Sequence, residues 1–96
     1  MEDSELERHY QSLLNRLHQY SEWPSLYRFK FIISSEEMKK LQRIESWFDG
    51  RKAKIRHFRS SKNNYLSITV DVTMNDPEEV LGFYRKAQEL EGVIAL

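Results

Sequence analysis

The sequence of 96 residues contains no cysteine. This excludes disulfides, thiolate nucleophiles, iron–sulfur clusters and cysteine-based zinc sites. No apolar run approaches the roughly 18 residues of a membrane span, and the polar, acidic start of the chain is unlike a signal peptide. The formal net charge is zero, so no overall attraction to nucleic acid or to a membrane is expected. These absences predict a cytoplasmic protein that binds no membrane, no metal and no cofactor.

Basic residues are nevertheless concentrated in one segment. Hydrophobic residues make up 40% of the chain, which is enough for the core of one small domain. Residues 50–62, "GRKAKIRHFRSSK", contain six basic residues and no acid. This run predicts a basic patch that could bind nucleic acid or another anion weakly; its residues are Arg51, Lys52, Lys54 and Arg56.

The first 24 residues are expected to form a helical extension ahead of a domain at residues 25–96. Residues 5–20 carry apolar side chains at the spacing of one helix face, and Pro24 follows them. The helix must bury this stripe against the open face of a sheet, the edge of the domain, or a second copy of itself. The stripe is therefore a candidate interface; its residues are Leu6, Tyr10, Leu13, Leu14 and Leu17.

The rest of the chain alternates between strand and helix patterns. Period-two alternation predicts strands at residues 26–33 and 65–74, with a weaker strand at 53–59 and a short one at 93–96. Ser34 and Glu37 match a capping box for a helix whose inner face is expected to carry Met38, Leu41, Ile44 and Phe48.

A second core helix is predicted to start at Asp76, with Pro77 in its first turn. The order βαββαβ then predicts an α+β, ferredoxin-like fold. It has a four-stranded antiparallel sheet, two helices on one face, and the N-terminal amphipathic helix in addition.

The uncovered face of such a sheet is expected to be mostly polar. Its predicted lining is Arg28, Lys30, Ile32, Tyr65, Ser67, Thr69 and Asp71. Sheet-based RNA binding needs stacking aromatics there, and only Tyr65 at the edge qualifies. His57 and Asp71 could approach one another across neighbouring strands, yet acid–base catalysis also needs a pocket. No catalytic residues are assigned, and the protein is not expected to be an enzyme.

The turn between the predicted strands at residues 53–59 and 65–74 has two interpretations. Serine and asparagine side chains bond the backbone of tight turns and fix strand register. The same turn could instead meet a phosphate or a partner carboxylate. The residues of this candidate anion or partner site are Arg59, Ser60, Ser61, Lys62 and Tyr65.

Four stretches resemble the YbeD-like family of small bacterial proteins of unknown function. They are "FKFII" (29–33), "SSKNNYLSITV" (60–70), "FYRKAQEL" (83–90) and "VIAL" (93–96). The resemblance covers residues 27–96 and implies a ferredoxin-like fold similar to ACT regulatory domains, without an established enzymatic activity. Asn63 stands where the family tends to have glycine, and the N-terminal extension is longer than in the minimal family member.

We therefore expect a non-enzymatic, ACT-like regulatory or protein-interaction module. Its partner would be a second copy of the chain or another protein, met through a sheet edge or the N-terminal helix. Two alternatives stay open. One is weak nucleic-acid or anion binding through residues 51–62, and the other is sensing of a small ligand.

Overall fold

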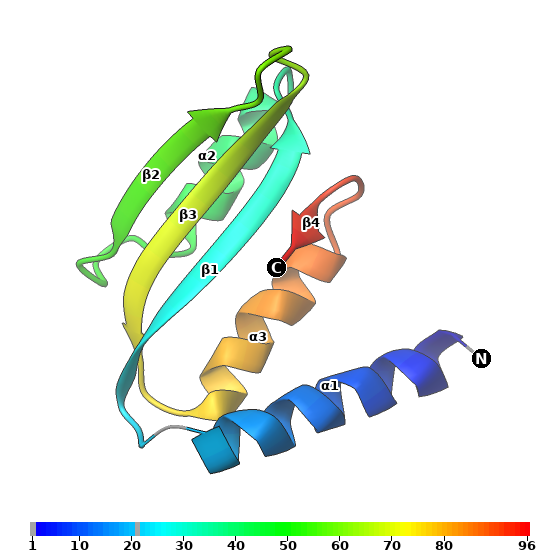
Figure 1. Cartoon of the computed structure of the whole chain (residues 1–96), viewed down its shortest axis with the longest axis vertical. Coiled ribbons are helices and arrows are strands. Elements are labelled where there is room, and N and C mark those ends of the chain that lie inside the picture. The colour runs from blue at the N-terminus through cyan, green and yellow to red at the C-terminus, as the bar shows by residue number, and fades with distance from the viewer. Residues whose placement is uncertain (1, 21) are drawn as a thin grey trace.

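The computed structural model describes residues 2–20 and 22–96, which form three helices and four strands (Figure 1). In chain order these are α1 (Glu2–Tyr20), β1 (Ser25–Ser34), α2 (Met38–Ser46), β2 (Lys54–Arg59), β3 (Tyr65–Met74), α3 (Pro77–Gln88) and β4 (Ile94–Ala95).

The four strands form one sheet in the order β2-β3-β1-β4, and every neighbouring pair is antiparallel. The two central strands, β1 and β3, pair along their whole length, from Ser25 opposite Met74 to Ser34 opposite Tyr65. Figure 1 shows β2 and the short β4 at the two edges. The predicted α+β class and the four-stranded antiparallel sheet are confirmed.

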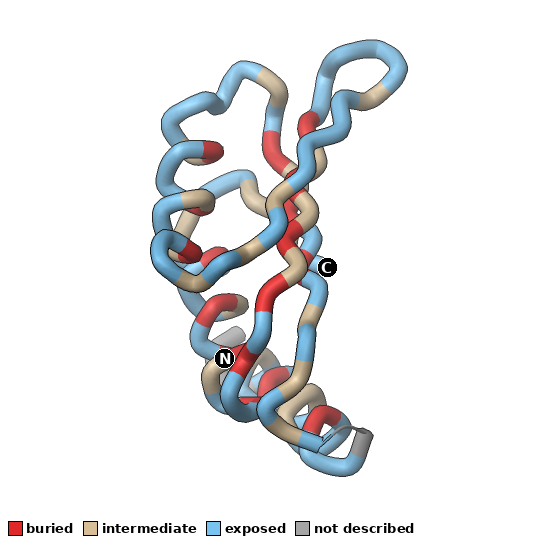
Figure 2. The backbone as a smooth tube through the Cα atoms, turned by 90° about the vertical axis from the view of Figure 1, so that its left-hand side faces the viewer, coloured by how far each residue is buried: buried red, intermediate tan, exposed pale blue. Residues whose placement is uncertain are grey.

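The core lies on one face of this sheet, where α2 and α3 pack (Figure 1). Along β3, buried and more accessible residues alternate strictly from Leu66 to Met74, as Figure 2 shows by colour. Phe29 and Phe31 of β1 meet Ile44 and Phe83 of the helices in the same buried cluster. The alternation predicted for both central strands is therefore confirmed.

The start of α3 is as predicted. The Asp76 side chain accepts a hydrogen bond from the Glu79 N–H at 2.8 Å, and Pro77 opens the helix. This carboxylate satisfies one of the unpaired N–H groups of the first turn.

The predicted capping box of α2 is wrong. Ser34 is the last residue of β1, paired with Tyr65, and Glu37 precedes α2 without a side-chain cap bond. Met38 is 45% exposed and does not belong to the core face. Phe48 is buried as predicted but lies beyond α2, in a turn where its ring stacks on Phe83 at 4.7 Å between centroids.

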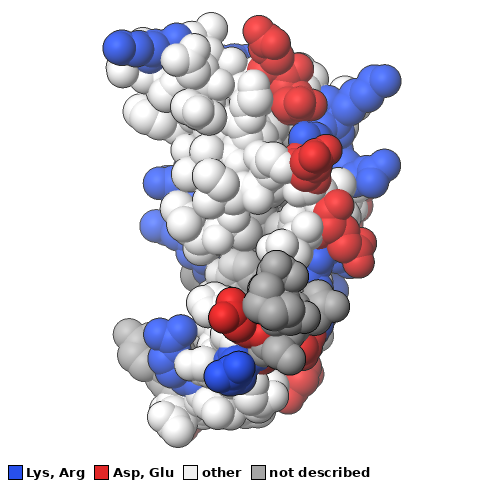
Figure 3. All heavy atoms as spheres, turned by 90° about the vertical axis from the view of Figure 1, so that its right-hand side faces the viewer, with Lys and Arg blue, Asp and Glu red and all other residues white. Residues whose placement is uncertain are grey.

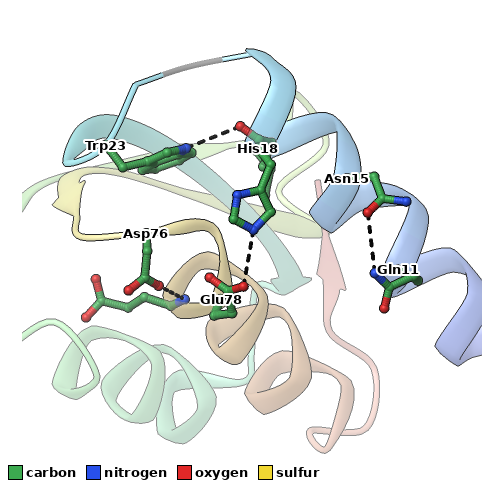
Figure 4. Close-up of polar contacts among 8 residues, drawn as sticks. Gln11, Asn15, His18, Trp23, Asp76 and Glu78 are labelled. Atoms are coloured by element: carbon green, nitrogen blue, oxygen red, sulfur yellow. Dashed lines mark hydrogen bonds and ion pairs between the residues drawn. The ribbon is translucent and has the colours of Figure 1, made fainter.

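Helix α1 packs beside α3 at the edge of the domain, and not over the open face of the sheet (Figure 1). Arg85 of α3 donates hydrogen bonds to both carboxylate oxygens of Glu7, at 2.9 and 3.1 Å. Figure 4 shows His18 facing Glu78. The Trp23 indole N–H donates to the Leu17 carbonyl at 3.2 Å. Leu17 itself joins the main core.

Candidate functional site

Among residues 2–20 and 22–96, no helix lies over the sheet face opposite α2 and α3, and in Figure 1 this face is turned toward the viewer. We call it the open sheet face. The strand registers place alternate residues of all four strands on it. Its members are Leu26, Arg28, Lys30 and Ile32 of β1, Lys54, Arg56 and Phe58 of β2, Tyr65, Ser67, Thr69, Asp71 and Thr73 of β3, Ile94 of β4, and the adjoining Leu96.

Exposed apolar side chains are concentrated on the open sheet face. Six large hydrophobic residues are well exposed in the described part of the chain, and Met38 of α2 is the one that lies elsewhere. Apolar surface gathered on one face is typical of an interaction site, and the strand registers place Phe58, Ile32 and Ile94 in one row across the sheet. The five on the open sheet face are Leu26, Phe58, Tyr65, Ile94 and Leu96.

Positive charge lies on the same face around a single carboxylate. Arg28 donates to the two Asp71 oxygens at 2.7 and 3.1 Å, and Arg56 donates to one of them at 3.3 Å. The hydrogen bond from Arg28 is the main cause that holds the pKa of Asp71 below its usual value. With Lys30 and Lys54 also present, the face carries four basic residues against one acid. An excess of positive charge remains for an anionic partner.

A shallow depression of about 480 Å³ runs across this face and is open to solvent. Arg28 and Lys30 border it on β1, and Arg56 and Phe58 border it on β2. Ser67 and Thr69 form part of its lining. An open depression with apolar and basic walls suits an extended polymer segment better than a small molecule, which prefers an enclosed pocket.

Several residues of the site predicted in the β2–β3 turn form hydrogen bonds with other residues of the same turn. The Ser60 hydroxyl oxygen accepts hydrogen bonds from the Asn64 and Tyr65 N–H groups, both at 3.1 Å. Arg59 donates to the Asn63 side chain at 3.3 Å. Ser61 and Lys62 are exposed. Ser60 therefore holds the turn together, and Tyr65 is the member of this set that belongs to the open sheet face.

The predicted basic patch is divided between two faces. Arg51 donates to Glu79 at 2.8 Å and lies over the Phe83 ring, on the helix side. Lys54 and Arg56 lie on the open sheet face, opposite Asp71 and Thr69. Lys52 is an exposed turn residue with a positive φ of 58°.

Lys54 and Arg56 share the open sheet face with Arg28 and Lys30, a grouping that was not predicted. Their place follows from the register of β2 with β3.

The candidate interface of α1 is partly covered by the chain itself. Tyr10 and Leu17 are buried, and the Arg85 guanidinium lies 4.6 Å from the centre of the Tyr10 ring. Leu6, Leu13 and Leu14 are half-buried. A groove of about 320 Å³ remains between α1, α3 and β4, and Figure 3 shows a broad uncharged surface on this side of the molecule.

The suggested approach of His57 to Asp71 is wrong. His57 pairs with Ile68 and shares its face of the sheet, whereas Asp71 pairs with Lys54 on the open sheet face. His57 contacts Glu45 of α2 at 2.5 Å, whereas Asp71 is held by arginines on the open sheet face. Tyr84 and Tyr27 share a hydrogen bond of 2.8 Å, and burial is the main cause that raises the pKa of Tyr84. Neither arrangement supplies a nucleophile with an adjacent base.

Within residues 2–20 and 22–96, no three His, Asp or Glu side chains gather as a metal site. None of the helices described there has the length and apolar character needed to cross a membrane.

A family model described as "Protein of unknown function (DUF493)" matches residues 18–96. The match begins within α1 and includes every strand of the sheet. No curated protein and no solved structure gave a significant match to the chain.

Proposed function

The chain belongs to the DUF493 family of proteins of unknown function, and we propose that it is a non-enzymatic protein-interaction module. In this proposal the open sheet face binds an acidic, partly apolar segment of a partner protein. The strand order β2-β3-β1-β4 supports describing the domain as ferredoxin-like and similar to ACT domains. A regulatory role of the ACT kind and the YbeD-like relationship are parts of the same proposal, as is a cytoplasmic location.

The observation that carries the proposal is the coincidence of apolar and basic surface. Five of the six exposed large hydrophobic residues share one face with four basic residues. Aromatic and arginine side chains are the usual energetic centres of protein interfaces, and Phe58 lies beside Arg56 here. The half-buried leucines of α1 offer less accessible apolar surface, so we place the interaction on the sheet.

Weak nucleic-acid binding is the second candidate, because Phe58 and Tyr65 add aromatic rings to the basic face. Bases stack on such rings while basic residues contact phosphates. Phosphate contacts make affinity fall steeply with salt, whereas an interface with an apolar centre is less sensitive. Salt dependence therefore separates the two candidates. Small-ligand sensing stays a prediction, tested by a rise in melting temperature on ligand addition.

The test compares two matched double variants in pull-downs from a nuclease-treated lysate of the source cell, at low and high salt. Phe58→Ser with Arg56→Glu changes the open sheet face. Met38→Ser with Lys39→Glu makes the same kind of change on exposed residues of α2. Circular dichroism shows whether both remain folded. We expect a protein that is captured by the wild type and the α2 variant at both salts, and lost with the sheet variant.

Equal capture by both variants would remove the open sheet face as the binding surface. Capture that is seen at low salt only when the nuclease is omitted, and that disappears at high salt, would favour nucleic acid instead.

A further inference from the structure

Strand β2 is an edge strand with an unpaired outer side. It occupies one end of the sheet, and within the described part of the chain it pairs only with β3. Ile55 is half-buried, and the other five residues of β2 are exposed. An edge of this length presents backbone N–H and C=O groups to any extended chain that can approach it.

The hydrogen-bond pattern identifies which backbone groups are free. Lys30 of β1 exchanges hydrogen bonds with Leu96, at 2.8 and 3.4 Å, so even-numbered β1 residues direct their backbone toward β4. Odd-numbered β1 residues then bond to even-numbered β3 residues, and odd-numbered β3 residues bond to β2. The β2 partners of those residues are Lys54, Arg56 and Phe58.

The backbone N–H and C=O groups of Ile55, His57 and Arg59 therefore point outward, away from β3.

The charge of β2 selects against a second copy of the same strand. Its sequence, KIRHFR, has basic residues on both faces, a histidine on the helix side, and no acid. Two such strands placed side by side would bring like charges together, which is destabilising. Natural edge strands carry charges of this kind to block self-association. The same charges attract an extended segment with acidic side chains.

Two details indicate that the edge of β2 binds a partner and does not only block self-association. Phe58, the fifth of the six β2 residues, is 73% exposed, and blocking self-association does not require it. Arg56 shares Asp71 with Arg28, and its 3.3 Å contact is longer than the 2.7 Å contact of Arg28. Arg56 can therefore turn to an incoming carboxylate while Asp71 keeps its closer partner.

We infer that an acidic extended segment of a partner protein binds by adding a fifth strand to the outer edge of β2. Its backbone bonds to Ile55, His57 and Arg59, its carboxylates meet Lys54 and Arg56, and an apolar side chain packs on Phe58. This inference rests on the proposed function, because it specifies how the segment bound at the open sheet face is held.

The test uses a capped synthetic peptide, Glu-Val-Thr-Glu-Val-Glu. In an antiparallel pairing with β2, its second residue, a valine, lies opposite Phe58, and the glutamates at its fourth and sixth positions lie opposite Arg56 and Lys54. Binding is followed by ¹H–¹⁵N NMR, with amide exchange measured at Ile55, His57 and Arg59. The informative variant is His57→Pro, which removes one outward N–H from an edge position where proline is tolerated. Its control is His57→Thr, which keeps that N–H. Both substitutions remove the contact with Glu45.

We expect the peptide to slow exchange of the three outward amides, and His57→Pro to weaken binding at least about fivefold relative to His57→Thr. This factor corresponds to about one net backbone hydrogen bond. Equal affinity of the two variants would refute strand addition but leave the open sheet face as the binding surface.

Absence of any shift at millimolar peptide would overturn the acidic strand as the ligand, and the lysate experiment would then decide the proposed function separately. A single-stranded oligonucleotide that shifts the β2 amides more strongly than the peptide would overturn a protein segment as the occupant.

Discussion

Replacing two phenylalanines by alanine, one at a time, tests whether one face of the sheet serves folding while the other is available for binding. Phe29 on β1 is fully buried, whereas Phe58 on β2 is 73% exposed. The Phe29 ring packs among five aromatic rings, with centroids 4.8 to 5.8 Å away. These belong to Tyr27, Phe31, Phe48, Phe83 and Tyr84.

The expected costs follow from burial. Phe29→Ala leaves a cavity in a core fixed by helices and strands, and a change of this kind costs about 3–5 kcal/mol. A domain of this length has a free energy of unfolding of about 5–14 kcal/mol, so a large part of the stability would be lost. Phe58→Ala removes a ring that solvent already reaches, and we expect a change within about 0.5 kcal/mol.

Urea unfolding measures both changes, with the fluorescence of Trp23 and Trp47 as the signal because both pack against the core. At a slope of about 1.5 kcal/mol per molar urea, Phe29→Ala should lower the midpoint by about 2 to 3 M. Phe58→Ala should leave it almost unchanged. Similar shifts for the two variants would refute the claim that Phe58 is dispensable for folding and therefore available for binding.

Three further predictions concern particular contacts. Asp76→Ala should lower the free energy of unfolding by about 1 kcal/mol because the Glu79 N–H loses its cap; a urea midpoint equal to that of the wild type would contradict the cap. Asn63 has a φ of 61°, so Asn63→Ala should melt at a lower temperature than Asn63→Gly, since an alanine in this region costs about 1–2 kcal/mol; both variants lose the bond to Arg59, and equal melting temperatures would argue against backbone strain. The hydrogen bond from Arg51 is the main cause that holds the pKa of Glu79 below its usual 4.5. A lowered pKa in the folded state stabilises the fold above the unfolded-state pKa, and this stability is lost as the pH falls through the folded value. The wild type should therefore lose more stability than Glu79→Gln on acidification below pH 4.5, and parallel pH profiles would disprove the coupling.

Elements specified by their own residues were predicted well. The alternation from Leu66 to Met74 predicts a strand with one buried face, and Asp76 followed by Pro77 predicts a helix start. Both patterns operate within a few residues, so distant contacts do not override them.

The start of α2 could not be predicted in the same way, because long-range bonds compete with the local motif. Ser34 is held in β1 by pairing with Tyr65. The Ser35 N–H bonds to the Asn64 carbonyl, and the Ser35 hydroxyl bonds to the Asn63 carbonyl. Once the chain is tied to the β2–β3 turn in this way, Ser34 is unavailable as a cap. The helix begins later, and Met38 is left in solvent.

The open sheet face was predicted in part. The alternation of β1 and β3 placed Arg28, Lys30 and Asp71 on it correctly. The contribution of β2 was missed because its apolar residues, Ile55 and Phe58, do not share a face and so give no clear alternation. The face of β2 follows only from its register with β3, which no single segment reveals.

The pairing pattern of β1 has a consequence for how the chain folds during synthesis. Ser34 pairs with Tyr65, and Phe31 pairs with Ala95, so each pair can form only after the later residue has been synthesised. The chain therefore closes long loops before these contacts repay the lost entropy, which slows folding. Until α3 emerges from the ribosome, the Phe29 ring lacks Phe83 and Tyr84, which pack against it in the folded chain. For that interval a newly made chain exposes apolar surface of the kind that promotes aggregation.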